Sequence, residues 1–305
     1  MAIIEASTPI TLKNILYLTD FSQPSEAALP FVVAIARNYG AIVHALHVLA
    51  PTHHTCTMPE VRVAEEGLDE RLAQAGMHEV DSKLSGIAHK TIVAREIGVW
   101  PAVEQAIKNN DVNLIALGTH GRTGTLKLLL GSVAEEVFRR SPVPVLTIGP
   151  GVYGGAHTDA RFRRVLFATN FENNPDAAVL YAVSLAQENQ GQLVLLHVIN
   201  GPQPGGGKLG PSVAETMHEL YEMVPKAAKF WCRSEAVVKY GEPAKQIVET
   251  AKEYCAELIV LCVRSHASNL DMATHFDKTT AHQVVAHASC PVLTVRGTDI
   301  RTWRN

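Results

Sequence analysis

The sequence lacks the features that mark several large classes of protein. It has no strong excess of charge of one sign, since 27 Lys and Arg stand against 30 Asp and Glu, for a formal net charge of −3. No basic field is therefore available to attract nucleic acid or an acidic membrane surface. The longest apolar runs have the length of strands and are too short to span a bilayer. The start has no basic segment followed by a long apolar one, so we expect no signal peptide.

Cysteines are few and scattered. There are five in 305 residues, an odd number without a Cys-x-x-Cys pair, which argues against a disulfide framework and favours a reducing cytoplasm. One loop places His53 and Cys56 at the spacing of a chelating pair. A closed metal site needs third and fourth ligands, and none is evident from spacing. We therefore expect no metal site, and read these two residues as solvated loop residues, with metal binding left open.

What the sequence does contain is an alternation of short apolar strands and amphipathic helices. Strands are expected at 14–21, 41–49, 91–96, 114–117 and 143–148, and helices at 22–38, 61–85, 101–108 and 133–140. Gly40 is placed to end the first helix, and Gly67 and Gly76 are possible breaks in the second. This βαβ alternation predicts an α/β fold with a parallel sheet and helices on both faces.

The same pattern then occurs a second time. Residues 165–171 repeat 15–21, residues 196–199 repeat 46–49, residues 258–261 repeat 114–117, and residues 291–294 repeat 144–147, all in the same order. A length of 305 residues also favours about two domains. We therefore predict a first domain at 1–149, a glycine-rich linker at 150–160 and a second copy of the domain at 161–305.

A glycine-rich turn follows the fourth strand of the first copy. It contains Gly118 and Gly121, and Gly131 and Ser132 then open a helix. Glycines allow close approach to the backbone, and a helix start presents unpaired N–H groups, which together suit a phosphate. Arg122 adds positive charge nearby. On spacing alone, a plain strand–turn–helix corner fits equally well.

The turn and its flanking strands resemble the universal stress protein family. Gly118, Gly121, Gly131 and Ser132 match the family pattern G-x2-G-x9-G-[ST] at every spacing, and the strand ending at 19–22 also matches. The resemblance covers nearly the whole chain, twice. It implies two tandem open five-stranded parallel sheets, each in the order 3-2-1-4-5 with helices on both faces, related by a pseudo-twofold axis. The ligand would lie at the carboxyl ends of the first and fourth strands.

The resemblance also implies a ligand and the residues that hold it. In nucleotide-binding members of the family, the motif glycines and the Gly-Ser pair hold the phosphates of ATP, with or without magnesium. Carried over by position, these are Gly118, Gly121, Gly131 and Ser132, while Asp20 and the main chain at Val48 lie near the nucleoside. The role of Arg122 is inferred from its charge and position alone. No catalytic residue is evident and there is no P-loop, so we expect at most a weak ATPase.

The second copy departs from this pattern. Cys262 stands in place of Gly118, Lys278 and Thr279 stand in place of Gly131 and Ser132, and Asn170 stands in place of Asp20. Side chains at these positions would crowd the backbone that a phosphate must approach. We therefore expect the second domain to be structural or divergent, without ATP bound in the manner of the family.

Three functions remain to be compared. The first is a cytoplasmic stress-response protein in which ATP is a regulatory ligand. The second is a nucleotide-free interaction module with an unknown protein partner. The third is an adenine-nucleotide-dependent enzyme such as an adenylyl transferase, which the Thr-Asp-Phe-Ser ending of the first strand disfavours. The resemblance further implies pairing of the last strands, 143–148 with 291–295, within one chain, and a homodimer is left open.

Overall fold

The computed structural model describes residues 10–49, 59–119, 131–152, 161–172, 174–201, 213–226, 228, 232–263 and 279–297, with only the backbone described at 59–66. These residues form two compact units. The N-terminal unit spans 12–148, and the C-terminal unit contains the described residues from 161 onward together with 10–11 and 149–152. Each unit is an α/β structure with a parallel sheet, so the predicted fold class is confirmed.

The N-terminal unit is built on five parallel strands. They are β1 (Asn14–Leu18), β2 (Ile42–Leu49), β3 (His89–Arg95), β4 (Leu114–Gly118) and β5 (Val145–Ile148). Their pairing places them in the order β3-β2-β1-β4-β5. The order of pairing reverses between β1 and β4, so the connections to the next elements diverge there and leave a crevice at the carboxyl ends of these strands.

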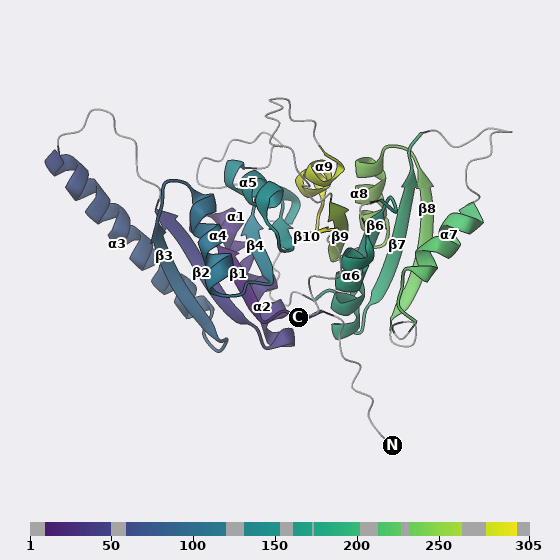
Figure 1. Ribbon diagram of the computed structural model, residues 1–305, viewed down its shortest axis with the longest axis horizontal. Helices are drawn as coiled ribbons and strands as arrows, with labels where there is room; N and C mark the ends of the chain where they lie inside the picture. Colours follow the sequence, from purple (N-terminus) through teal and green to yellow (C-terminus); the bar gives the residue numbers. More distant parts are fainter. Residues whose placement is uncertain are drawn as a thin grey trace, which may run out of the picture. The chain divides into compact units, whose positions relative to one another are not determined.

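Helices cover both faces of this sheet (Figure 1). They are α1 (Gln23–Glu26), α2 (Leu29–Tyr39), α3 (Pro59–Lys83), α4 (Val99–Asn109) and α5 (Ser132–Arg140). Along β1, Leu16 and Leu18 join one buried cluster with Trp100 and Val103 of α4. Because strand side chains alternate, Tyr17 lies on the opposite face, where α2 packs on β1.

Two local predictions for the N-terminal unit are wrong. The predicted helix at 22–38 is two helices, α1 and α2, with Pro30 in the first turn of α2. A proline has no N–H to continue a helix, and a first turn tolerates it. The predicted breaks at Gly67 and Gly76 do not occur, because α3 runs through both. Gly40 does end α2, in the left-handed conformation at φ 61°.

The C-terminal unit repeats the same plan. Its strands are β6 (Arg164–Thr169), β7 (Gln192–Ile199), β8 (Arg233–Tyr240), β9 (Leu258–Val263) and β10 (Val292–Arg296), all parallel, in the order β8-β7-β6-β9-β10. Its helices are α6 (Asp176–Glu188), α7 (Val213–Glu222), α8 (Pro243–Glu253) and α9 (Thr280–His287), and a 3₁₀ turn, η1, covers Pro150–Val152. The strands of each unit therefore follow one another in corresponding positions.

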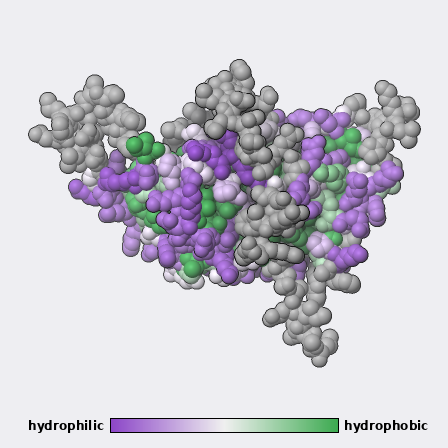
Figure 2. All heavy atoms as spheres, viewed as in Figure 1, coloured by the Kyte–Doolittle hydropathy of each residue, from purple (hydrophilic) through white to green (hydrophobic). Residues whose placement is uncertain are grey.

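The described surface is mostly hydrophilic on the face that Figure 2 shows, with hydrophobic residues in small patches. Scattered apolar side chains of this kind are normal for a folded protein. The most exposed large apolar residue among those described is Ile97, at 80%. Among the described residues, no helix combines the length and apolar character that crossing a bilayer requires.

Candidate functional site

A tight turn follows β1 at the point where the strand order reverses. The Thr19 hydroxyl oxygen accepts a hydrogen bond from the Phe21 N–H at 3.1 Å, and the Asp20 carboxylate accepts bonds from the N–H and hydroxyl of Ser22. Phe21 has a φ of 62°, a left-handed conformation that few residues other than glycine adopt. Side-chain hydrogen bonds of this type hold the chain in such a turn. Thr19 and Asp20 are thereby fixed at the carboxyl edge of the sheet.

His47, near the end of β2, is attached to this turn. The side chain is 7% exposed, and its Nδ1 lies 2.8 Å from the main-chain oxygen of Thr19. A carbonyl oxygen only accepts, so Nδ1 carries the proton and donates. The imidazole ring also lies 4.4 Å from the ring of Phe21, measured between centroids, at an angle of 31°. His47 therefore connects the end of β2 to the end of β1.

Helix α1 packs directly against the end of β4. A Cβ built on Gly118 would overlap the carbonyl group of Pro24 and lie 2.8 Å from the Ser25 nitrogen. The Ser25 hydroxyl lies 3.2 Å from the Thr19 hydroxyl, and the Tyr17 hydroxyl donates to the main-chain oxygen of Ser25 at 2.9 Å. Burial raises the pKa of Tyr17 to about 12, so this donor keeps its proton. The absent side chain at Gly118 thus allows α1 to close on the sheet.

Helix α5 begins with a glycine cap. Gly131 has φ −60° and ψ 150°, and its N–H donates to the Thr119 oxygen at 2.7 Å. Glycine has no side chain to accept from the first-turn N–H groups, and no side-chain cap is found in the part of α5 that the structure describes. The positive end of the helix dipole therefore lies at Ser132 and Val133, where no side chain of the cap residue competes for the first-turn N–H groups.

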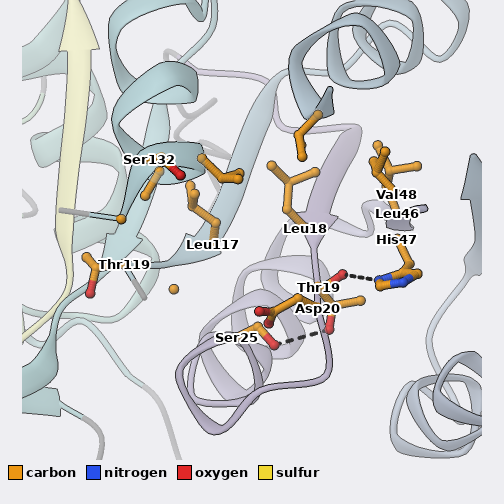
Figure 3. A pocket seen from close by; sticks show the side chains of 15 residues that line it. Leu18, Thr19, Asp20, Ser25, Leu46, His47, Val48, Leu117, Thr119 and Ser132 are labelled. Atoms are coloured by element: carbon orange, nitrogen blue, oxygen red, sulfur yellow. Dashed lines mark hydrogen bonds between the residues drawn. The ribbon is translucent and has the colours of Figure 1, made fainter. Parts of the chain in front are cut away.

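These elements enclose a cavity of about 220 Å³ (Figure 3). It lies at the carboxyl ends of β1, β2 and β4 and at the start of α5. In Figure 3 the β1 and β2 residues lie on one side and Leu117, Thr119 and Ser132 on the other. The lining residues are Leu18, Thr19, Asp20, Ser25, Leu46, His47, Val48, Val99, Leu117, Gly118, Thr119, Gly131, Ser132, Val133 and Ala134. The site therefore combines apolar walls with a few hydroxyl groups, one carboxylate and an open helix start.

Comparison with known proteins agrees with this geometry. The sequence model of the universal stress protein family matches residues 11–149 and again 161–296. The chain belongs to the universal stress protein family. Both copies of the fold described above are therefore universal stress protein domains.

Single-domain relatives match about half of the chain. Universal stress protein MJ0577 of Methanocaldococcus jannaschii is 26% identical over 46% of this chain and 96% of its own length. Universal stress protein MJ0531 of the same organism is 30% identical over 45% of this chain and 81% of its own length. A solved universal stress protein from Archaeoglobus fulgidus covers 94% of this chain and 97% of its own, at 23% identity and a TM-score of 0.71. That last likeness shows the shared fold over both halves.

Most of the site residues predicted from the universal stress protein motif are brought together. Asp20, Val48, Gly118, Gly131 and Ser132 all line the one cavity. Gly121 and Arg122 lie outside the described residues, as do His53 and Cys56. Among the residues that are described, no group of three or more His, Cys, Asp or Glu side chains is placed to hold a metal ion.

Sequence reasoning missed three hydroxyl groups that line the cavity. These hydroxyl groups belong to Thr19, Ser25 and Thr119. Thr19 precedes Asp20 and Thr119 follows Gly118, so their positions at strand ends were a usable signal. Ser25 gave no such signal, because its place in the wall depends on how α1 folds back over β4.

The second universal stress protein domain has the same turn after its first strand as the first domain. Thr169 accepts from the Phe171 N–H at 2.9 Å, Phe171 again has φ 62°, and His197 Nδ1 lies 2.9 Å from the Thr169 oxygen. The rings of Phe171 and His197 are 4.8 Å apart. Asn170 takes the place of Asp20, and its side-chain oxygen accepts from the Glu172 N–H at 3.2 Å. The strand-end turn is therefore common to both domains.

The part of the second domain that corresponds to Gly118 and the start of α5 differs in two ways. Cys262 replaces Gly118, and its sulfur lies 3.9 Å from the Asn174 oxygen, while no short helix precedes α6 in the described part of this connection. Burial raises the pKa of Cys262 to about 11. Thr279 caps α9, and its hydroxyl accepts from the His282 N–H. The start of α9 is therefore partly satisfied by its own side chain, whereas α5 begins with glycine.

Proposed function

We propose that the N-terminal domain, residues 1–149, binds ATP in this cavity as a regulatory ligand, with at most slow hydrolysis. The C-terminal domain, residues 161–305, is structural or divergent. One observation carries the proposal: the glycine-capped start of α5 opens into a cavity at the ends of β1 and β4. Family membership and the position at the switch point of the sheet agree with a nucleotide ligand.

The phosphates belong at the α5 end of the cavity. The first-turn N–H groups and the Ser132 hydroxyl supply hydrogen-bond donors, and the helix dipole favours negative charge there. The backbone conformation of Gly131 is one that any residue can adopt, so glycine is not required for its conformational freedom. What matters here is the missing side chain, which lets a phosphate approach the backbone. Magnesium would accompany the phosphates.

The nucleoside belongs between β1 and β2. The Asp20 carboxylate and the main chain at Val48 provide polar contacts, and Leu18 and Leu46 provide apolar walls. The cavity, at about 220 Å³, is smaller than the roughly 300–1,000 Å³ typical of sites for whole drug-sized ligands. That size suits a nucleoside with its phosphates extending outward over the start of α5.

Slow hydrolysis is expected from the position of the two titratable side chains in the described wall, His47 and Asp20. His47 donates through Nδ1 to Thr19, and the Asp20 carboxylate accepts from Ser22. A general base must lie within hydrogen-bond reach of the water that it activates. Both groups lie on the β1 and β2 side of the cavity, which we assign to the nucleoside, and not at the α5 end that we assign to the phosphates, and this position favours binding over turnover (Figure 3).

A nucleotide-free interaction module is the alternative, and the C-terminal domain favours it. Its helix start is capped by Thr279, and Cys262 stands where the first domain has glycine. If the N-terminal domain had the same function as the C-terminal domain, we would expect α5 to begin with a side-chain cap, as α9 does. The cavity at α5 therefore favours ATP for the N-terminal domain.

The test compares two matched aspartates at helix caps. Gly131→Asp places a carboxylate at the start of α5, and Thr279→Asp does the same at α9. Asp is a good cap, so both variants are expected to fold. At α5 the new negative charge opposes a phosphate directly. Nucleotide released from the purified protein by denaturation is then counted, and ATP with magnesium is titrated by calorimetry.

We expect one adenine nucleotide per wild-type chain, lost in Gly131→Asp and kept in Thr279→Asp. Loss in both variants, or two nucleotides per chain, would contradict the assignment to one domain. No binding in the wild type would favour the interaction module. The cytoplasmic location, the pairing of the two domains through their last strands and a homodimer stay predictions from the sequence.

A further inference from the structure

Helix α3 meets the strand-end turn at a glycine. A Cβ built on Gly76 would lie 2.7 Å from Cγ and 2.8 Å from both Cδ atoms of the Phe21 ring. Real Cβ atoms do not come this close to a ring, so any other residue would force Phe21 to move. Glycine is a poor helix former, yet α3 continues through this position. Gly76 therefore allows the helix backbone to rest on the aromatic ring.

Phe21 has little freedom to yield. Its N–H is held by the Thr19 hydroxyl, and its φ of 62° leaves few alternative conformations. The ring also packs on His47 at a centroid distance of 4.4 Å. A displacement of the ring by an added Cβ would therefore be passed to His47 or to the turn itself.

His47 and Thr19 line the cavity, while Phe21 and Gly76 do not. A series of direct contacts therefore links α3 to the cavity wall. Gly76 contacts the Phe21 ring, the Phe21 ring packs on His47, and His47 is bonded to the Thr19 main-chain oxygen at 2.8 Å. Every link is a direct contact between described residues. The next residue along the chain is Asp20, whose carboxylate faces the proposed nucleoside.

We propose that Gly76 is a positioning residue of the nucleotide site, acting through Phe21 on His47 and Thr19. The inference rests on the proposed function in that the ligand of this wall is taken to be ATP. Gly76 touches no ligand. Because Gly76 has no side chain, the Phe21 ring can pack against α3 and keep His47 of β2 next to the turn after β1.

The same helix supplies a matched control. A Cβ at Gly67 would meet nothing within 4 Å. Gly67→Ala and Gly76→Ala therefore make the same chemical change in α3, and only the second adds a clash. Phe21→Leu removes the ring from the other side of the contact, and the double variant Phe21→Leu with Gly76→Ala completes a double-mutant cycle.

Two readouts are needed. The first is the affinity for ATP with magnesium, measured by calorimetry on the full chain. The second is the NMR spectrum of the His47 ring, assigned by its loss in His47→Gln, since the Phe21 ring current acts directly on these signals. The second readout does not depend on any nucleotide, so it separates a failure of this inference from a failure of the proposed function.

We expect Gly76→Ala to weaken ATP binding by roughly 3- to 10-fold, as an off-rotamer displacement of one side chain would. It should also shift the His47 signals, and Gly67→Ala should do neither. In the Phe21→Leu background, adding Gly76→Ala should have little further effect. Unchanged His47 signals in Gly76→Ala, or equal effects of both glycine variants, would overturn the inference.

If wild-type protein binds no ATP, the proposed function fails, and the His47 signals still decide whether Gly76 sets this wall. If Gly76→Ala does not fold, Phe21→Leu takes its place, because it removes the contact without a clash. That variant should lower ATP affinity more than Gly67→Ala does, and equal affinities would then count against the inference.

Discussion

Gly118 and Pro24 lie in backbone contact, with no room between them for a side chain. Gly118 ends β4, and Pro24 belongs to the short helix α1 that follows β1. The sequence motif explains this glycine by the approach of a phosphate. The structure adds a second reason, because the same missing side chain lets α1 bring Ser25 into the cavity wall.

We therefore predict that Gly118→Ala destabilises the N-terminal domain even without ligand. The added methyl must push α1 away from β4, and overpacking of this kind costs about 1–3 kcal/mol. Denaturant unfolding measures the loss. Gly67→Ala is the control, since its Cβ has open space and a better helix former there should raise stability by roughly 0.4–1 kcal/mol. Equal stability of Gly118→Ala and wild type would show that α1 yields without cost.

The two helix starts should respond differently to loss of a hydroxyl. Thr279→Ala removes the side chain that accepts from the His282 N–H at the start of α9, which should cost about 1 kcal/mol. Ser132→Ala leaves the glycine cap of α5 in place and should change stability much less. Hydrogen exchange of the first amides of α9 localises the effect, and unaltered protection there in Thr279→Ala would argue against the cap.

His44 should make the protein less stable in mild acid. Its side chain is 2% exposed, Nε2 lies 3.1 Å from the Asn14 side-chain oxygen, and Nδ1 has no hydrogen-bond partner in the described structure. Burial, and then the charge of Lys90, lower the pKa of His44. Below about pH 6.5, His44 therefore binds a proton in the unfolded chain but stays neutral in the folded chain.

The free energy of unfolding should consequently fall as the pH drops through this value, until the lowered pKa of folded His44 is reached. Unfolding by denaturant between pH 5 and pH 8 tests this. His44→Gln should show a weaker loss toward acid than wild type does. An identical pH dependence of the two proteins would mean that His44 is protonated in the folded protein as readily as in the unfolded chain.

His89 should act in the opposite sense. Its Nδ1 lies 2.7 Å from the Ile87 oxygen and its Nε2 lies 2.9 Å from the Asp81 carboxylate. Both partners favour the doubly protonated ring, and the Ile87 carbonyl, followed by Asp81, raises the pKa of His89. The resulting stabilisation is fully present below the unfolded pKa of about 6.5 and is lost as the pH rises through the folded value.

His89→Asn should therefore lose stability relative to wild type at pH 5.5 and approach it at pH 8.5. The same unfolding series measures this difference, and NMR titration of His89 gives the direction of its shift directly. A difference from wild type that grows toward alkaline pH would refute the assigned sign.

Local sequence features predicted much of the fold. The alternation of strands and helices, the two copies and the end of α2 at Gly40 all follow from short-range patterns, because periodicity, caps and left-handed glycines act within a few residues. The motif also marked Gly118, Gly131 and Ser132, which line the cavity. Its spacing indicated where β4 ends and where α5 begins.

Other features depended on residues far apart in the sequence. Gly76 was a possible break in a helix, and it instead lets that helix rest on Phe21. His47 stands in an apolar strand, a pattern that fits the core and the wall of a site equally, and the structure places it in the cavity wall with its ring bonded to the Thr19 main-chain oxygen.

The sequence by itself determined that this chain is two universal stress protein domains with one intact and one altered glycine motif. Only the tertiary structure decided what each glycine does. The use of a missing side chain depends on which backbone or ring occupies the space beside it. For Gly118 that neighbour is Pro24 and for Gly76 it is Phe21, each more than fifty positions away along the chain.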